Sequence, residues 1–82
     1  RFTIDTATKL EGIVLIKTDP TRTKQAAAAL SKAATRVFET SGDYDIAALI
    51  EAYTMEELNR KIDEIRRLPA VQSTNTLIKL KE

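Results

Sequence analysis

The feature that most constrains the fold of this chain is an order of predicted elements that occurs twice: strand, helix, strand. Residues 10–18 form an aliphatic and β-branched run, which predicts a strand. Asp19 and Pro20 then predict a helix start, as N-cap and first helical residue. Apolar residues recur after them at helical spacing: Ala26, Leu30, Ala33, Ala34 and Val37. Residues 37–40 predict a short strand, which ends at the turn Ser41-Gly42-Asp43.

The second half of the chain repeats this order. Residues 44–53 predict a strand, and Thr54-Met55-Glu56-Glu57 is a capping box that predicts a helix start. The helix has an apolar stripe made of Met55, Leu58, Ile62 and Ile65. Leu68-Pro69 ends it, and residues 71–81 predict the last strand. The order β-α-β-β-α-β predicts an α+β, ferredoxin-like sandwich, with one four-stranded antiparallel sheet and two helices on one face.

The predicted strands carry apolar side chains on both faces, although two helices cover only one face of such a sheet. Ile13 and Leu15 point away from Val14 and Ile16. The third strand repeats the pattern, with Ile46, Ala48 and Ile50 on one face and Ala47 and Leu49 on the other. The last strand has Leu77 on one face and Ile78 with Leu80 on the other. An uncovered apolar face is an association surface, unless a shifted register or a β-bulge redistributes the side chains. We favour a homo-oligomer whose sheets pack face to face across a two-fold axis.

The composition excludes several classes of function. The chain has 82 residues, a size typical of one domain, and contains neither Cys nor His. It therefore lacks a disulfide, a thiol nucleophile, the usual zinc ligands and a near-neutral imidazole base. Its glycines are Gly12 and Gly42, so it has no Gly-rich phosphate loop. We expect a cytoplasmic protein that is not an enzyme, with no catalytic residue, cofactor or metal.

The charge and the strand composition bear on nucleic acids and membranes. Thirteen Lys and Arg stand against twelve Asp and Glu, which gives a net charge of +1. Such a balance provides no broad positive field for nucleic-acid binding, and the predicted central strands lack the aromatic residues with which RNA-binding sheets stack on bases. No apolar run reaches the ~20 residues that span a bilayer. We expect no direct nucleic-acid binding by this chain and no membrane association.

Two polar segments remain unexplained by packing. Asp43 and Asp45 lie two residues apart, either as an acidic pair or as residues that hold a turn through local hydrogen bonds, which we favour. Ser73-Thr74-Asn75-Thr76 opens a strand that should bury apolar surface. A ligand with an amine and a carboxylate needs the carboxylate, hydroxyls and loop amides that these segments provide. The polar residues of the last strand are equally compatible with a solvated edge strand.

These residues together resemble the effector-binding (RAM) domain of the prokaryotic Lrp/AsnC, or feast/famine, transcriptional regulators. The segment Ser41-Gly42-Asp43-Tyr44-Asp45 is similar to the family's Thr-Gly-x-x-Asp turn before an aliphatic strand. Residues 68–71, Leu-Pro-Ala-Val, are similar to its Leu-Pro-Gly-Val, and residues 73–78 to its Thr-x-Thr strand. The resemblance covers essentially the whole chain. It departs from the family pattern at Ser41, where Thr is usual, and at Ala70, where Gly is frequent.

The resemblance implies a homodimer assembled into a ring, commonly an octamer, with an amino-acid effector bound between subunits. Carried over, it gives a set of ligand-binding residues: Gly42, Asp43, Tyr44, Asp45, Ser73, Thr74 and Thr76. Gly42 would face the effector carboxylate, and Asp43 or Asp45 its ammonium. Residues 1–9 look like the hinge strand that follows a helix-turn-helix DNA-binding domain, here missing, and residues 10–82 are then the ligand-binding and oligomerisation domain. The alternative is a stand-alone or purely structural assembly domain that binds no ligand.

Overall fold

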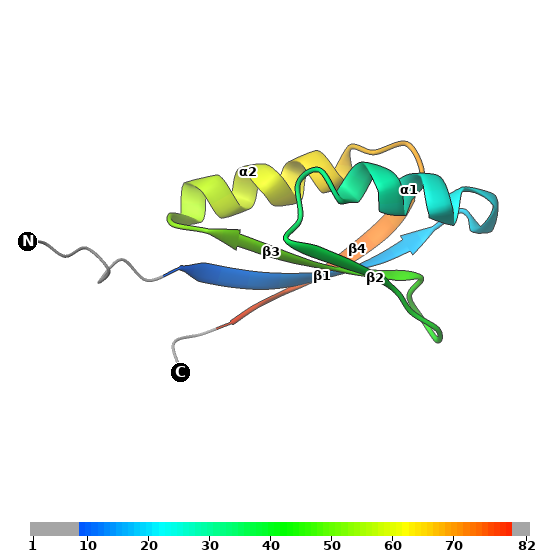
Figure 1. Ribbon diagram of the computed structural model, residues 1–82, viewed down its shortest axis with the longest axis horizontal. Helices are drawn as coiled ribbons and strands as arrows, with labels where there is room; N and C mark the ends of the chain where they lie inside the picture. The colour runs from blue at the N-terminus through cyan, green and yellow to red at the C-terminus, as the bar shows by residue number, and fades with distance from the viewer. Residues whose placement is uncertain (1–8, 80–82) are drawn as a thin grey trace, which may run out of the picture.

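One antiparallel sheet carries two helices on one of its faces in the computed structural model of the chain, which describes residues 9–79 (Figure 1). The elements are β1 (Leu10–Thr18), a 3₁₀ turn η2 (Pro20–Arg22), α1 (Thr23–Leu30), β2 (Arg36–Glu39), β3 (Ile46–Ala52), α2 (Met55–Arg66) and β4 (Val71–Ile78). The strand order is β2-β3-β1-β4. Element order and layers confirm the predicted α+β, ferredoxin-like sandwich.

Strand β1 lies inside the sheet and pairs with two neighbours. Val14 pairs with Ala48 of β3 on one side and with Thr76 of β4 on the other. Because side chains alternate along a strand, Val14 and Ile16 face the helices and are fully buried, whereas Ile13 and Leu15 face the opposite side. The same alternation in β3 and three buried residues of α2 complete the core, whose members are Val14, Ile16, Ala26, Leu30, Ile46, Ala48, Ile50, Ala52, Leu58, Ile62, Ile65 and Ala70.

The first helix is shorter than the sequence pattern predicts. Asp19 does act as an N-cap, but of η2, where its carboxylate accepts from the Thr21 N–H, and α1 begins at Thr23. The predicted helical continuation through Ala33 and Ala34 is wrong, whereas the predicted change to a strand at Val37 is confirmed. After Leu30 the chain turns, and the Thr35 N–H donates to the Leu49 carbonyl of β3. Pairing with β3 thus ends the helix early, and Val37 lies in β2.

The second helix follows its predicted cap but not its whole predicted stripe. Thr54 Oγ1 accepts from the Glu57 N–H (3.0 Å), and Glu57 Oε1 accepts from the Tyr53 N–H (3.0 Å), one residue before the N-cap. Leu58, like Ile62 and Ile65, is buried. Met55 is 46% exposed, so its assignment to the stripe is wrong: a residue in the first turn lies beyond the edge of the core.

The ends of two strands also differ from prediction. β3 begins at Ile46 instead of residue 44. The backbone of Asp45 forms its hydrogen bonds in the loop before the strand. β4 ends at Ile78 within the described residues, while the predicted end at residue 81, like Leu80, lies outside them. Of the predicted hinge over residues 1–9, all but Lys9 lies outside the described residues.

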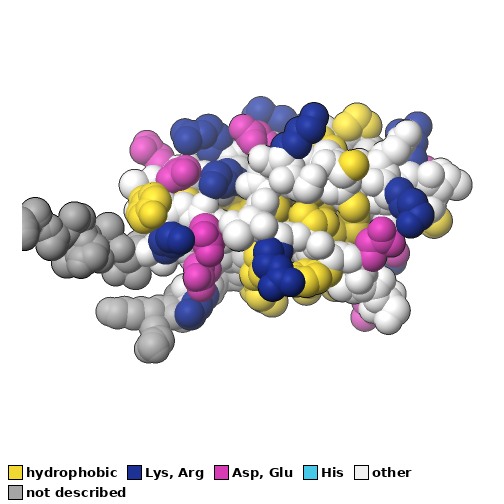
Figure 2. Space-filling model, viewed as in Figure 1, with side chains coloured by type: hydrophobic (Ala, Val, Ile, Leu, Met, Phe, Trp, Pro, Cys, Tyr) yellow, Lys and Arg dark blue, Asp and Glu magenta, His cyan; other side chains and the backbone are white. Residues whose placement is uncertain are grey.

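The side of the sheet that carries no helix (Figure 1) has apolar side chains on all four strands, as the strand patterns predict. Figure 2 views this side edge-on and shows hydrophobic side chains along its near edge. We call this surface the open face; its apolar members, from the register, are Ile13, Leu15, Phe38, Ala47, Leu49 and Leu77. Leu77 is 52% exposed, and the Arg36 guanidinium lies over the Phe38 ring, 4.7 Å from its centre. The register shift in β1–β4 pairing occurs between Lys17 and Thr18, at the start of β4, so it does not redistribute these side chains.

Two residues of the predicted stripe in α2 should respond differently to truncation. Leu58→Ala removes a fully buried side chain and should lower the free energy of unfolding by about 2–5 kcal/mol. Met55→Ala removes an exposed one and should change it by less than about 0.5 kcal/mol. Urea denaturation of both variants measures the difference. Equal losses would show that Met55 belongs to the core after all.

Candidate ligand site at the end of strand β1

The carboxyl end of β1 lies between the two polar segments that the sequence singled out. On one side the Asp45 N–H, just before β3, donates to the Ile16 carbonyl (2.9 Å). On the other side Ser73 of β4 pairs with Lys17. β3 and β4 are the two neighbours of β1, and adjacent strands lie about 4.8 Å apart, so the two segments lie about 10 Å apart across β1.

Asp45 is fixed by a set of hydrogen bonds to β1 and to the loop. Its Oδ2 accepts from the Thr18 N–H (2.9 Å) and from Thr18 Oγ1 (3.4 Å). Thr18 is 2% exposed, and its hydroxyl also contacts Thr23 Oγ1 of α1 (2.8 Å). The Asp45 carbonyl accepts from the Thr40 N–H (2.9 Å). Asp45 therefore has a structural role, but it holds the end of β1 against the β2–β3 loop through the distant Thr18 rather than through the local side-chain hydrogen bonds that we expected.

The same side chain lines a polar cleft of about 450 Å³, which we call the Asp45 cleft. Its other lining residues come from η2, α1, the end of β2 and the following loop: Pro20, Thr21, Thr23, Lys24, Glu39 and Thr40. Lys24 Nζ lies 3.9 Å from Glu39 Oε2, and the Lys24 side chain is 91% exposed, so this ion pair is weak. The cleft thus presents two carboxylates, one ammonium and three hydroxyls, a set suited to a small zwitterion.

A second aspartate orders the rim of the Asp45 cleft. Asp19 Oδ1 accepts from both the N–H and the hydroxyl of Thr21, each at 3.0 Å. The backbone hydrogen bond, followed by the hydroxyl bond, lowers the pKa of Asp19 below its ordinary value because both donors stabilise the ionised carboxylate. Asp19 is therefore ionised at neutral pH and holds Thr21 at the cleft.

The turn that contains Gly42 lies beside the Asp45 cleft without lining it. Gly42 has a φ of +103°, which favours glycine, and Thr40 Oγ1 donates to the Tyr44 carbonyl (2.8 Å) across the turn. The Asp43 side chain is exposed, and its backbone carbonyl accepts from Lys17 Nζ (3.1 Å). Among the predicted site residues, the structure brings Gly42, Asp43, Tyr44 and Asp45 into one loop.

The predicted site residues of β4 lie elsewhere. Thr74 and Thr76 are half-buried on the helix side of the sheet, opposite Ile16 and Val14. Ser73 is exposed on the open face. None of the three lines the Asp45 cleft. A single ligand that touched both segments would therefore have to cross the end of β1 or be completed by another copy of the chain.

The site includes residues that the sequence interpretation missed. Thr18, Thr23, Lys24 and Glu39 come from three elements and belong to no motif. Only Thr18 could have been noticed in the sequence. It is a polar residue at a helix-facing position of β1, where Val14 and Ile16 on the same face are aliphatic. Lys24 and Glu39 gave no such signal, because only the packing of α1 beside β2 brings them together.

Within residues 9–79, no group of three or more His, Cys, Asp or Glu is arranged to hold a metal ion. The helices of this region are also too short and too polar to cross a membrane.

The model of one protein family, described as "Lrp/AsnC ligand binding domain", matches residues 11–82. This chain belongs to that family. It is 37% identical over 86 residues to the HTH-type transcriptional regulator LysM of Sulfurisphaera tokodaii, a match that covers 99% of the chain and 61% of LysM. The chain thus spans less than two thirds of this curated relative.

Solved structures share the fold of this chain. TTHA0845 from Thermus thermophilus superposes with a TM-score of 0.83 at 26% identity, covering 89% of this chain and 95% of that one. A feast or famine regulatory protein from M. tuberculosis, complexed with L-methionine, superposes with a TM-score of 0.73 at 22% identity, covering 89% of this chain and 51% of that one. The second likeness shows the fold alone.

A shorter similarity extends to an enzyme. Homocitrate synthase of Sulfurisphaera tokodaii is 48% identical over 46 residues, which cover 56% of this chain and 10% of the enzyme. The similarity therefore concerns a small part of that enzyme, whereas the match to the regulator LysM extends over nearly the whole chain.

The two aspartates of the loop should differ in their effect on stability. Asp45→Ala leaves the buried Thr18 N–H without its acceptor and should lower the free energy of unfolding by about 1–3 kcal/mol. Asp43→Ala removes an exposed side chain and should change it by less than about 0.5 kcal/mol. Chemical denaturation of the two variants tests this, and an unaffected Asp45→Ala would argue against the Asp45–Thr18 contact.

Proposed function

We propose that this chain is the amino-acid-sensing and oligomerisation domain of an Lrp/AsnC-type transcriptional regulator. The observation that carries the proposal is the Asp45 cleft in a domain of a ligand-binding family. The M. tuberculosis structure with L-methionine supports an amino acid as the class of effector. The domain senses the effector by binding it and is not an enzyme.

The geometry of the Asp45 cleft supports a defined role for each charged group. Asp45 Oδ2 is occupied by Thr18, which leaves Oδ1 to meet the ammonium of an amino acid. Lys24, weakly paired with Glu39, is the cation of the cleft and faces the effector carboxylate. The backbone amides around Gly42, together with Asp43 and Tyr44, complete the site from the adjoining loop.

We propose that β4 contributes to a site in a second copy of the chain. Ser73 and Thr74 lie about 10 Å from the Asp45 loop within one chain, and Thr76 lies farther away along β4. We propose that they complete an effector site of a neighbouring subunit, so that the effector is bound between subunits. Such an arrangement links effector binding to assembly, because a bound ligand then stabilises the contact between copies.

The open face supports the assembly part of the proposal. Its apolar side chains are exposed in a single chain, and apolar surface of this kind marks an association site in small proteins. We propose that two copies pack these faces together as a homodimer, and that dimers associate into an octamer or a similar ring. The helices then remain on the outside.

DNA binding is assigned to a different part of the regulator. In this proposal residues 1–9 are a hinge that follows a helix-turn-helix domain and residues 10–82 are the sensing domain. The net charge of +1 supports this division, since an excess of one basic residue provides no broad positive field for the phosphate backbone. The regulator acts in the cytoplasm, where its DNA is.

Effector binding is tested by calorimetry and thermal shift with each of the twenty amino acids. We expect at least one of them to raise the melting temperature of the wild-type chain. Asp45→Asn keeps an oxygen for the Thr18 N–H but removes the charge, so it should fold normally and bind that amino acid at least about tenfold more weakly. Asp43→Asn, in the same loop, separates the roles of the two aspartates: an unchanged affinity assigns the ammonium to Asp45.

The alternative function, a purely structural assembly domain, has its own signature in this experiment. No amino acid would then shift the melting temperature of the wild-type chain. Asp45→Asn would behave as the wild type does under every condition.

Assembly is tested by light scattering. The wild-type chain should have a mass of at least twice the 9.1 kDa of one copy. Leu77→Lys places a charge on the open face and should shift the mass toward that of a single copy, whereas Met55→Lys, an equally drastic change at an exposed residue of α2, should not. A wild-type mass of one copy would contradict face-to-face assembly.

A further inference from the structure

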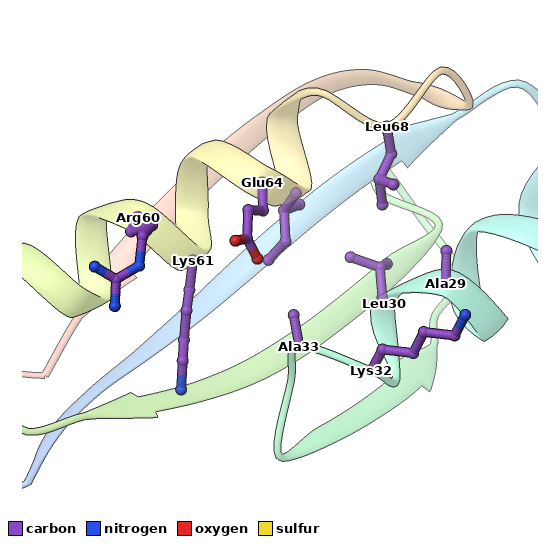
Figure 3. A pocket seen from close by; sticks show the side chains of 9 residues that line it. Ala29, Leu30, Lys32, Ala33, Arg60, Lys61, Glu64 and Leu68 are labelled. Atoms are coloured by element: carbon purple, nitrogen blue, oxygen red, sulfur yellow. The ribbon is translucent and has the colours of Figure 1, made fainter.

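A groove of about 370 Å³ lies between α1 and α2, on the side of the sheet opposite the open face (Figure 3). Its volume falls within the range of small-molecule sites. The lining residues are Ala29, Leu30, Lys32, Ala33, Arg60, Lys61, Glu64, Ile65 and Leu68. They come from the end of α1, the turn after it, α2 and the segment that follows α2.

The groove exists because the end of α1 carries small side chains. Ala29 and Ala33 present only a methyl group toward α2, and α1 ends at Leu30, so no longer side chain fills the space. Leu30 and Ile65 are buried and form the floor, and Leu68 is half-buried at one end. The floor is therefore aliphatic and already part of the folded core.

The rim of this groove carries charges that have no partner. Within the described residues, Lys32, Arg60 and Glu64 take part in no ion pair or side-chain hydrogen bond, whereas Lys61 is engaged by the Glu51 carbonyl (2.7 Å) and by Glu57 (3.7 Å). Arg60 and Glu64 lie one turn apart on α2, and Figure 3 shows Glu64 between Arg60 and the aliphatic floor. Arg60, Glu64 and the aliphatic floor thus border one space, whereas the Lys32 side chain points away from α2, toward α1 (Figure 3).

We propose that this groove binds a small zwitterion with an aliphatic side chain, namely an apolar α-amino acid. Arg60 meets its carboxylate, Glu64 meets its ammonium, and the side chain lies on Leu30 and Ile65. This site is distinct from the Asp45 cleft, whose one apolar lining residue is Pro20 and which offers an aliphatic side chain little contact. In a face-to-face dimer the groove remains accessible on the outer surface.

The ligand requirement is tested by calorimetry with L-leucine and two analogues that each lack one charge. The analogue 4-methylpentanoate lacks the ammonium, and 3-methylbutylamine lacks the carboxylate. We expect leucine to bind at least about tenfold more tightly than either, because each analogue loses one charge-assisted contact. An equal affinity for leucine and 4-methylpentanoate would overturn the role of Glu64.

Variants locate the site. Arg60→Gln and Glu64→Gln should each weaken leucine binding about tenfold or more, whereas Arg67→Gln, an exposed arginine outside the groove, should leave it unchanged. Ala29→Leu fills the groove without altering its charge and keeps a helix-forming residue, so it should abolish leucine binding while the chain stays folded.

The same variants distinguish leucine binding in the groove from leucine binding in the Asp45 cleft. Leucine binding that survives Asp45→Asn but is lost in Ala29→Leu supports the groove. Leucine binding that is lost in Asp45→Asn and survives Arg60→Gln and Ala29→Leu overturns the groove and leaves the proposed function standing. Absence of leucine binding to the wild-type chain also overturns it, while the other amino acids still test the Asp45 cleft.

Discussion

The central position of β1 is the constraint on which the rest of this structure depends. Both of its edges are hydrogen-bonded, to β3 and to β4, so its register determines which residues of both neighbours face the helices. Val14 and Ile16 direct one face into the core, and Ile13 and Leu15 direct the other to the open face. A slip of one residue would exchange the two faces, and because both are apolar, hydrophobicity alone does not forbid it.

Thr18 and Asp45 resolve this ambiguity at the end of β1. The Thr18 N–H bonds to Asp45 Oδ2, and its hydroxyl reaches Thr23 of α1, so these bonds form only when Thr18 faces the helices. The adjacent Lys17 faces the other side and bonds to the Asp43 carbonyl. Two consecutive residues of β1 therefore hold the β2–β3 loop from both faces of the sheet.

The sequence was sufficient for the order of elements and for the two faces of the strands, because both follow from local periodicity. The wrong predictions concern features that depend on contacts with residues distant in the sequence. α1 ends at Leu30 because Thr35 pairs with Leu49, and Met55 is exposed because the core ends before the first turn of α2. The role of Asp45 was open for the same reason: its partner Thr18 lies 27 residues earlier. No periodic pattern reports such a contact.

The Asp45 cleft and the groove between the helices differ in how many of their polar groups already form hydrogen bonds within the protein. At the Asp45 cleft, Thr18 holds Asp45 and Asp19 holds Thr21 through hydrogen bonds, so both lining side chains are ordered before a ligand arrives. Pre-ordered groups of this kind lower the entropy that binding must overcome. In the groove between the helices, only the aliphatic floor is fixed, while Arg60 and Glu64 are exposed and form no ion pair or side-chain hydrogen bond within residues 9–79. Affinity in that groove must therefore come mainly from burying an aliphatic side chain, whereas in the Asp45 cleft it comes from charge and hydrogen bonding.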